Sequence, residues 1–235
     1  MTWLTDNWGE ILVAFGVTVE MTVMAGIIAM VVGFVLAALR VSPIPLGRAV
    51  GAAYVRLVRN TPLLLIMLIF AFGLPELDIR PEFHVAGWFG SSSHSSLLNF
   101  DVFYVFATAA LGLYTAAFVC EAVRSGINAI PVGQAEAARS IGMTFTQTLS
   151  NVVLPQAFRA VIPPLASTMI AMCKNSSIAS GVGVTEATFE MHKLTNDYSS
   201  ATFPIFIGFA IGYIVLVALI SGASGGLERR LGVLR

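Results

Sequence analysis

The chain has 235 residues, of which 57% are hydrophobic and 11% are charged, and its formal net charge is zero. Soluble domains carry about 25% charged residues, so this composition and its long apolar runs exclude an ordinary soluble protein. Spans in lipid must be helices or closed barrels. Barrel strands would alternate apolar and polar residues, and these runs do not. We therefore predict an all-α integral membrane protein with a single transmembrane domain over residues 1–235.

The first predicted span covers residues 11–39. It is preceded by Asp6 and Glu10 rather than by a basic segment, and the first basic residue is Arg40. We therefore expect no signal peptide. Glu20 is either a functional ionisable group within the span or a residue near the outer interface. Several small residues suit close packing of helices in lipid: Gly16, Ala25, Gly26, Ala29, Gly33 and Ala37.

Residues 40–61 carry four arginines and no acidic residue. The positive-inside rule places them in the cytoplasm, and Pro43 and Pro45 predict a loop because proline breaks helices. Asn60 and Thr61 then precede Pro62, and the second predicted span covers residues 62–73. Thr61 is the expected N-cap and Pro62 the expected first helical residue.

A polar loop over residues 74–100, with a serine-rich stretch at 91–96, is expected outside the cell. The third predicted span covers residues 102–120 and continues into Glu121 and Arg124. These two side chains are spaced i, i+3 and can pair on one helix face. An ion pair and a polar element of the transport path are both open readings of Glu121.

Residues 131–155 read PVGQAEAARSIGMTFTQTLSNVVLP and separate two apolar runs. Pro131 suits the first turn of a helix, and the following residues favour helix. Gly142 can adopt the left-handed conformation that ends one. The alanines of this segment give a narrow helix that a partner could approach closely.

The fourth predicted span covers residues 156–172, with a kink expected at Pro163 and Pro164. A polar string follows it, beside a glycine-rich break that can expose polar groups to a cavity. That string is Lys174, Asn175, Ser176 and Ser177. Residues 184–200 predict a short amphipathic helix at the outer face, and the fifth predicted span covers residues 203–221.

The positive-inside rule orients these five spans with the N-terminus outside and the C-terminus in the cytoplasm. Ten of the thirteen basic residues then lie on the cytoplasmic side: Arg40, Arg48, Arg56, Arg59, Arg124, Arg139, Arg159, Arg229, Arg230 and Arg235. Cys120 and Cys173 are expected to be buried thiols. The histidines are scattered, and we predict no metal site.

Four strings resemble the permease subunits of type I ABC importers. The first string is similar to the EAA loop of that family, with valine in place of isoleucine. It consists of Glu136-Ala137-Ala138, three further residues, Gly142, nine further residues and then Val152-x-Leu154-Pro155. The string from Arg59 to Leu64 resembles the RNTPLL of polar amino-acid permeases. The string from Lys174 to Ser180 resembles their KNTS segment, and the pattern around Glu121 resembles the one that precedes their EAA loop.

This resemblance implies a five-helix permease fold in which a cytoplasmic coupling helix docks on an ATPase. It assigns ATPase coupling to Gln134, Ala135, Glu136, Ala137, Ala138, Arg139 and Gly142. Our candidates for the substrate path are Asn60, Thr61, Glu121, Lys174, Asn175, Ser176 and Ser177.

The resemblance further implies a multi-pass protein of the bacterial cell membrane that imports a polar amino acid. Strings around Val41 and Gln134 are similar to actinobacterial glutamate-import permeases, so L-glutamate is expected. The implied partners are an ABC ATPase dimer, a second permease (a paralogue or a second copy) and an external binding protein, expected to be a lipoprotein. No nucleic acid is expected. The chain itself has no phosphate-binding loop, so it is not expected to be an enzyme or to hold a cofactor, and ATP and Mg²⁺ belong on the ATPase.

Two other readings stay open. The substrate could be another polar amino acid such as glutamine. A chain of a different class, an ion-coupled secondary carrier that uses Glu20 or Glu121, would also suit broken helices. A membrane enzyme is disfavoured because no nucleophile, ligand cluster or carboxylate pair has suitable spacing.

Overall fold

The computed structural model describes residues 2–42, 44–79 and 102–230, and every regular element within these ranges is a helix. Residues 80–101, which hold most of the predicted external loop with its serine-rich stretch, lie outside the described residues. The expected external position of that loop therefore stays a prediction.

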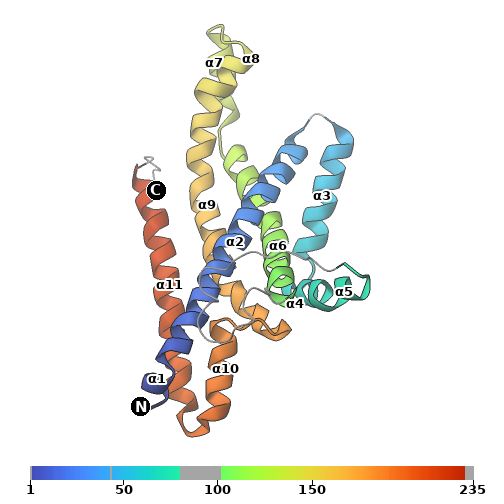
Figure 1. Ribbon diagram of the computed structural model, residues 1–235. Coiled ribbons are helices and arrows are strands. Elements are labelled where there is room, and N and C mark those ends of the chain that lie inside the picture. The colour runs from blue at the N-terminus through green and yellow to red at the C-terminus, as the bar shows by residue number, and fades with distance from the viewer. Residues whose placement is uncertain (1, 43, 80–101, 231–235) are drawn as a thin grey trace.

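The chain begins with a short helix, α1 (Thr2–Asp6). The centre of the molecule is a pair of long helices, α2 (Trp8–Val41) and α6 (Val102–Asn128), which pack against each other (Figure 1). Their backbones come close because glycines face the partner helix. A Cβ atom at Gly33 of α2 would lie 2.5 Å from Val119 Cγ1, and one at Gly112 of α6 would lie 2.7 Å from Ile28 Cβ. The predicted close packing through small residues of the first span is thus confirmed at Gly33.

The segment predicted as a proline-broken loop at residues 40–61 contains a helix, α3 (Pro45–Arg59), and that part of the prediction was wrong. Pro45 stands in the first turn, where its missing N–H costs nothing. Gly51 and Val55 give α3 a buried side, which packs on α2 and α6, while Arg56 and Arg59 are exposed. An amphipathic repeat after Pro45 was the signal that sequence reasoning passed over.

After α3 the chain bends by 102° into α4 (Leu63–Leu68), a π-helix η1 (Ile69–Gly73) and α5 (Leu74–Glu76). The expected N-cap is also corrected here. Pro62 occupies the N-cap position of α4, and the Thr61 hydroxyl donates back to the Leu57 carbonyl at 2.8 Å. At about 1.5 Å per residue, residues 63–76 are too short to cross a bilayer core of ~30 Å without α3.

The second half of the chain runs through α7 (Val132–Ser140), α8 (Phe145–Thr148), the π-helix η2 (Leu149–Val153) and α9 (Leu154–Asn175). A 3₁₀ segment η3 (Ser176–Val182), α10 (Ala187–Asp197), a 3₁₀ turn η4 (Ser199–Ala201) and α11 (Thr202–Arg230) complete it. The short helix predicted within residues 184–200 is confirmed as α10. In Figure 1, α7 and α8 project at one end of the molecule, while the N-terminus and α10 lie at the other.

Among the described residues, three helical stretches are long and apolar enough to cross a membrane alone: Trp8–Val41, Val102–Asn128 and Ser199–Arg230. The bent pair Pro45–Arg59 and Leu63–Glu76 would add a fourth if it forms one span. α9 has 22 residues but is less apolar, because Arg159 and the Pro163–Pro164 pair interrupt its apolar run. The expected five-span arrangement and its orientation stay predictions.

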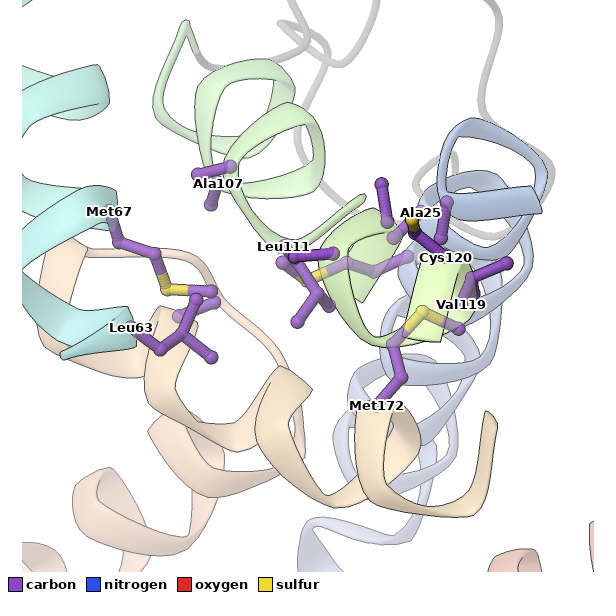
Figure 2. Close-up of a cluster of buried hydrophobic side chains, with 14 of the residues drawn as sticks. Ala25, Leu63, Met67, Ala107, Leu111, Val119, Cys120 and Met172 are labelled. Carbon is purple, nitrogen blue, oxygen red and sulfur yellow. The ribbon is translucent and has the colours of Figure 1, made fainter. Parts of the chain in front are cut away.

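Two apolar clusters hold the helices together. The larger one joins α2, α3, α4, α6, α9 and η3, and Figure 2 shows Met67, Leu111, Val119 and Met172 pointing into it. The smaller cluster lies at the N-terminal end and holds α10 and α11 on α1 and α2: Trp3, Ile11, Ala187, Leu194, Ile205 and Phe209. Cys120 and Cys173 are buried free thiols, as predicted.

Candidate functional site

The predicted coupling segment begins with α7, a helix of nine residues at the tip of the molecule (Figure 1). Pro131 is its N-cap rather than its first helical residue, and the Pro131 carbonyl accepts the Gln134 N–H at 3.0 Å. This small correction leaves the expected helix in place.

The end of α7 is fixed by Gly142, whose φ is 91°. The Gly142 N–H donates to the Arg139 carbonyl at 3.0 Å, and the Met143 N–H donates to the Ala138 carbonyl at 3.2 Å. These two bonds form a Schellman motif, which needs a left-handed residue at this position. The predicted left-handed role of Gly142 is confirmed.

The turn after Gly142 is held just as firmly. Thr144 and Gln147 form a capping box in which each side chain accepts the other residue's backbone N–H, at 3.3 and 2.9 Å. The π-helix η2 then leads directly into α9. Because η2 contacts α7, α8 and α9, the turn connects α7 to α9 through packed elements.

The surface of α7 suits contact with another protein. Ala138 faces the protein, whereas Gln134, Glu136, Ala137 and Arg139 are exposed and Ala135 is half-buried. Three large apolar side chains in and just after this helix are strongly exposed: Val132 (73%) in its first turn, Ile141 (81%) at its C-cap and Phe145 (73%) at the start of α8. An exposed apolar rim around small residues is typical of an interaction surface.

Glu121 lies in an ion-pair cluster near the end of α2. Its carboxylate contacts the Arg40 guanidinium, and Arg124 Nη1 lies 3.4 Å from Glu121 Oε1. The expected Glu121–Arg124 pair is confirmed, and Arg40 is the partner that sequence reasoning missed. Nearby, Arg59 Cζ lies 5.3 Å from the centroid of the Phe118 ring, so cations from α2 and α3 both bind to α6.

The two polar strings of the predicted substrate path lie on neighbouring elements. η3 packs against α4 and α6, and a Cβ atom at Gly181 would lie 3.2 Å from Leu64 Cδ1. Asn60 and Lys174 are exposed, while Thr61, Asn175 and Ser177 are half-buried. Glu121 lies instead in the ion-pair cluster with Arg40 and Arg124, so the structure does not bring all seven candidates together.

The hydroxyls of the second string bond back to their own chain. Ser176 donates to the Cys173 carbonyl and Ser177 to the Lys174 carbonyl, both at 2.7 Å. Ser180 donates to the Ser177 carbonyl at 2.8 Å. These bonds accompany the change from α-helix to 3₁₀ geometry, which ends at Gly183 with a φ of 90°. Lys174 and the Asn175 amide are the members left to face a solute.

Sequence reasoning missed a buried polar cluster around Glu186, which is 0% exposed. Its carboxylate caps α10 by accepting the N–H groups of Thr188 and Phe189 at 2.9 and 3.1 Å. The Tyr213 hydroxyl of α11 donates to the same carboxylate at 2.8 Å, and Thr18 of α2 lies 3.4 Å away. Burial raises the pKa of the Glu186 carboxyl above its ordinary value, although these donors favour the charged form.

The Glu186 cluster fixes the segment that follows the predicted substrate string. A single side chain connects α2, α10 and α11, because its partners come from all three. A second link lies at the surface, where Lys193 Nζ is 2.5 Å from Glu10 Oε2 and 3.2 Å from Glu190 Oε1. Within the described ranges, no group of three or more His, Cys, Asp or Glu side chains could hold a metal ion.

Comparison with known proteins gives consistent results. Residues 29–233 match the family described as "Binding-protein-dependent transport system inner membrane component". The chain is 40% identical to the "Glutamate transport system permease protein GluC" of Corynebacterium glutamicum and 39% identical to its namesake in Corynebacterium efficiens. Each match covers 97% of this chain and 96% of the relative.

A solved structure described as an "amino acid ABC transporter with histidines" has the same fold. Its TM-score is 0.81 at 27% sequence identity, over 97% of this chain and 96% of that one. The similarity therefore extends over the whole helical arrangement, the tip that carries α7 included.

Proposed function

Since this chain belongs to the family of binding-protein-dependent transport system inner membrane components, we propose that it is the permease of an ATP-driven importer for L-glutamate. It is a transport component of the inner membrane and not an ATPase. Its class implies an ATPase and a binding protein as partners. The observation that carries the choice of substrate is the likeness to two glutamate permeases over nearly the full chain.

In this proposal the chain crosses the membrane five times, with its N-terminus outside and α7 in the cytoplasm. The positive-inside count supports that orientation, as does the position of α7 at the end opposite the N-terminus. The second span is then the bent pair α3 and α4. Its arginines Arg48, Arg56 and Arg59 drop out of that count, while the arginines at the end of α2, in α7 and at the end of α11 keep its sign. The less apolar α9 is the fourth span, shielded by its neighbours.

The proposed mechanism couples α7 to an ATPase dimer, which holds ATP and Mg²⁺. The exposed apolar rim of α7 docks on one ATPase subunit, and ATP-driven closure of the dimer moves α7 together with α9. A second permease, either a paralogue or another copy of this chain, completes the path. ATP can shift the transporter between inward-facing and outward-facing states only if it binds one of them more tightly.

We propose that substrate passes alongside the packed pair α4 and η3, next to Asn60 and Lys174. The ammonium group of Lys174 can balance a substrate carboxylate, and the Asn175 amide can donate to it. Glu121 acts instead as a structural link between α2 and α6, because two arginines already occupy its carboxylate. An external binding protein, expected to be a lipoprotein, delivers the amino acid.

The test is purification of the complex from its native membrane, with mass spectrometry of the proteins that accompany this chain. We expect an ATPase, a second permease and a binding protein. The complex is then reconstituted in vesicles, and its ATPase activity is measured with the binding protein loaded with glutamate, glutamine or arginine, or left empty.

Stimulation by the glutamate-loaded protein supports the proposal, and a preference for glutamine or arginine would replace the substrate. Stimulation by a sugar and by no amino acid would overturn it. Uptake that persists without the ATPase but collapses with the ion gradient would favour a secondary carrier instead.

A further inference from the structure

The last helix, α11, is packed against the rest of the chain mainly near its start. Its only buried residues are Ile205 and Phe209, and Phe209 stacks on Phe15 of α2 with ring centroids 5.6 Å apart. Beyond these turns, α11 packs on α9 but stands away from α2. A groove of about 1540 Å³ opens between the three helices, with two residues of α6 at its wall.

The walls of this groove are almost entirely apolar, as Val31, Phe34, Phe158 and Leu219 illustrate. The two hydroxyls that line it are already used within their own helices. Thr22 donates to the Thr18 carbonyl at 2.7 Å, and Ser224 donates to the Ile220 carbonyl at 2.8 Å. The groove therefore suits a hydrocarbon chain rather than a polar solute.

One end of the groove is basic. Arg159 of α9 lines it, and no carboxylate in the described part of the chain lies within ion-pair distance of its guanidinium. Arg229 and Arg230 end α11 just beyond Leu227, another lining residue, and Glu228 is the single acidic residue of that turn. This end of α11 points toward the side of the molecule that carries α7 (Figure 1).

The groove is long enough for the acyl chains of a lipid. Along α9 its lining runs from Leu154 to Cys173, a rise of about 28 Å, which is close to the ~30 Å of a hydrocarbon core. From Arg159 to Cys173 the rise is about 21 Å, so acyl chains that start at Arg159 stay within the lining. The volume also exceeds the ~300–1,000 Å³ that is usual for pockets that hold drug-sized ligands. A two-chain lipid would fill it with its headgroup at the arginines.

We propose that this groove binds a phospholipid with an anionic headgroup, taken from the leaflet that faces α7. Its acyl chains lie between α2, α9 and α11, and its phosphate group pairs with Arg159, supported by Arg229 and Arg230. The lipid takes the place of the protein contacts that α11 lacks. The assignment to the cytoplasmic leaflet rests on the proposed function, whereas the site itself does not.

The competing occupant is a helix of a second permease. The charge pattern favours the lipid, because three guanidinium groups against one carboxylate call for an anion at the mouth of an apolar groove. A helix alone would bury these walls but would not neutralise the mouth.

The test uses the assembled complex in nanodiscs made of phosphatidylcholine with a minor share of phosphatidylglycerol. Native mass spectrometry counts the phosphatidylglycerol molecules that stay bound to the wild type, to Arg159→Gln and to Arg56→Gln. Arg56 is the matched control, because it is an exposed arginine of α3 outside the groove. Recovery of the complex from the membrane is measured for each variant.

We expect retention of phosphatidylglycerol over phosphatidylcholine in the wild type and in Arg56→Gln. Arg159→Gln should weaken it about tenfold, as expected for loss of one hydrogen bond to a charged group. Equal retention of both lipids, or no effect of Arg159→Gln, would overturn the proposal.

A second measurement places a cysteine at Leu219 in the otherwise unchanged complex. Crosslinking of that cysteine to the second permease would show that a protein helix fills the groove, and this too would overturn the lipid assignment. Neither measurement depends on which amino acid is transported, so the lipid site and the glutamate proposal can fail separately.

Discussion

Replacing Glu186 with alanine should destabilise the protein, because its carboxylate holds three helices together. The substitution removes the N-cap of α10, which is worth about 0.5–2 kcal/mol. It also removes the acceptor of the 2.8 Å bond from Tyr213, and a hydrogen bond to a charged group contributes about 1.5–3 kcal/mol. Relief from burying a charge offsets part of this loss. We expect a net decrease of about 2–3 kcal/mol in the free energy of unfolding.

The assay is thermal unfolding of the detergent-solubilised complex. For a chain of this size, 1 kcal/mol shifts the midpoint by about 2–4 °C, so Glu186→Ala should lower it by roughly 4–12 °C. Glu76→Ala is the control, because Glu76 is an exposed glutamate of α5, far along the chain from this cluster. It should leave the midpoint within about 1 °C, as surface substitutions usually do. An unchanged midpoint in Glu186→Ala would refute the view that this cluster fixes α10.

Three further outcomes follow from the same contacts. Gly142→Val should strain the left-handed end of α7 by about 1–2 kcal/mol, and Glu136→Lys should reverse the charge of its exposed face. In both variants the chain should insert normally but the ATPase should stop responding to the loaded binding protein, and normal glutamate uptake would contradict the coupling role. Arg40→Ala and Glu121→Gln should each lower the unfolding midpoint, and the double variant should lose less than the sum, since the two side chains share one ion pair. Because burial raises the pKa of Glu186 above its ordinary 4.5, folding binds a proton. The stability of the wild type relative to Glu186→Gln should therefore fall as pH rises above that ordinary value, as unfolding midpoints can show.

The features predicted well from the sequence depend on neighbours in the chain. The end of α7 at Gly142 and the Glu121–Arg124 pair involve residues within a few positions of each other, so local rules were enough. The helical nature of the long apolar stretches followed from composition alone.

The features that were missed depend on distant partners or on a balance of local signals. Thr18 lies 168 positions before Glu186, and Arg40 lies 81 before Glu121, and no rule of spacing connects such pairs. At α3, the proline at the start was read as a break although it is compatible with a first turn. The Thr61 hydroxyl donates to the Leu57 carbonyl of α3 instead of capping α4. A threonine between two helices can bond to the backbone of either one, so its position alone did not decide between them.

The loose packing of α11 has a consequence for how cells make this protein. Of the three candidate spans, α11 is the one least buried by its own chain, with only Ile205 and Phe209 fully buried. A copy that finds no partner subunits would keep this helix poorly anchored, and local opening there would expose it to membrane proteases. Balanced synthesis of all the subunits would then matter more for the abundance of this chain than its own folding stability.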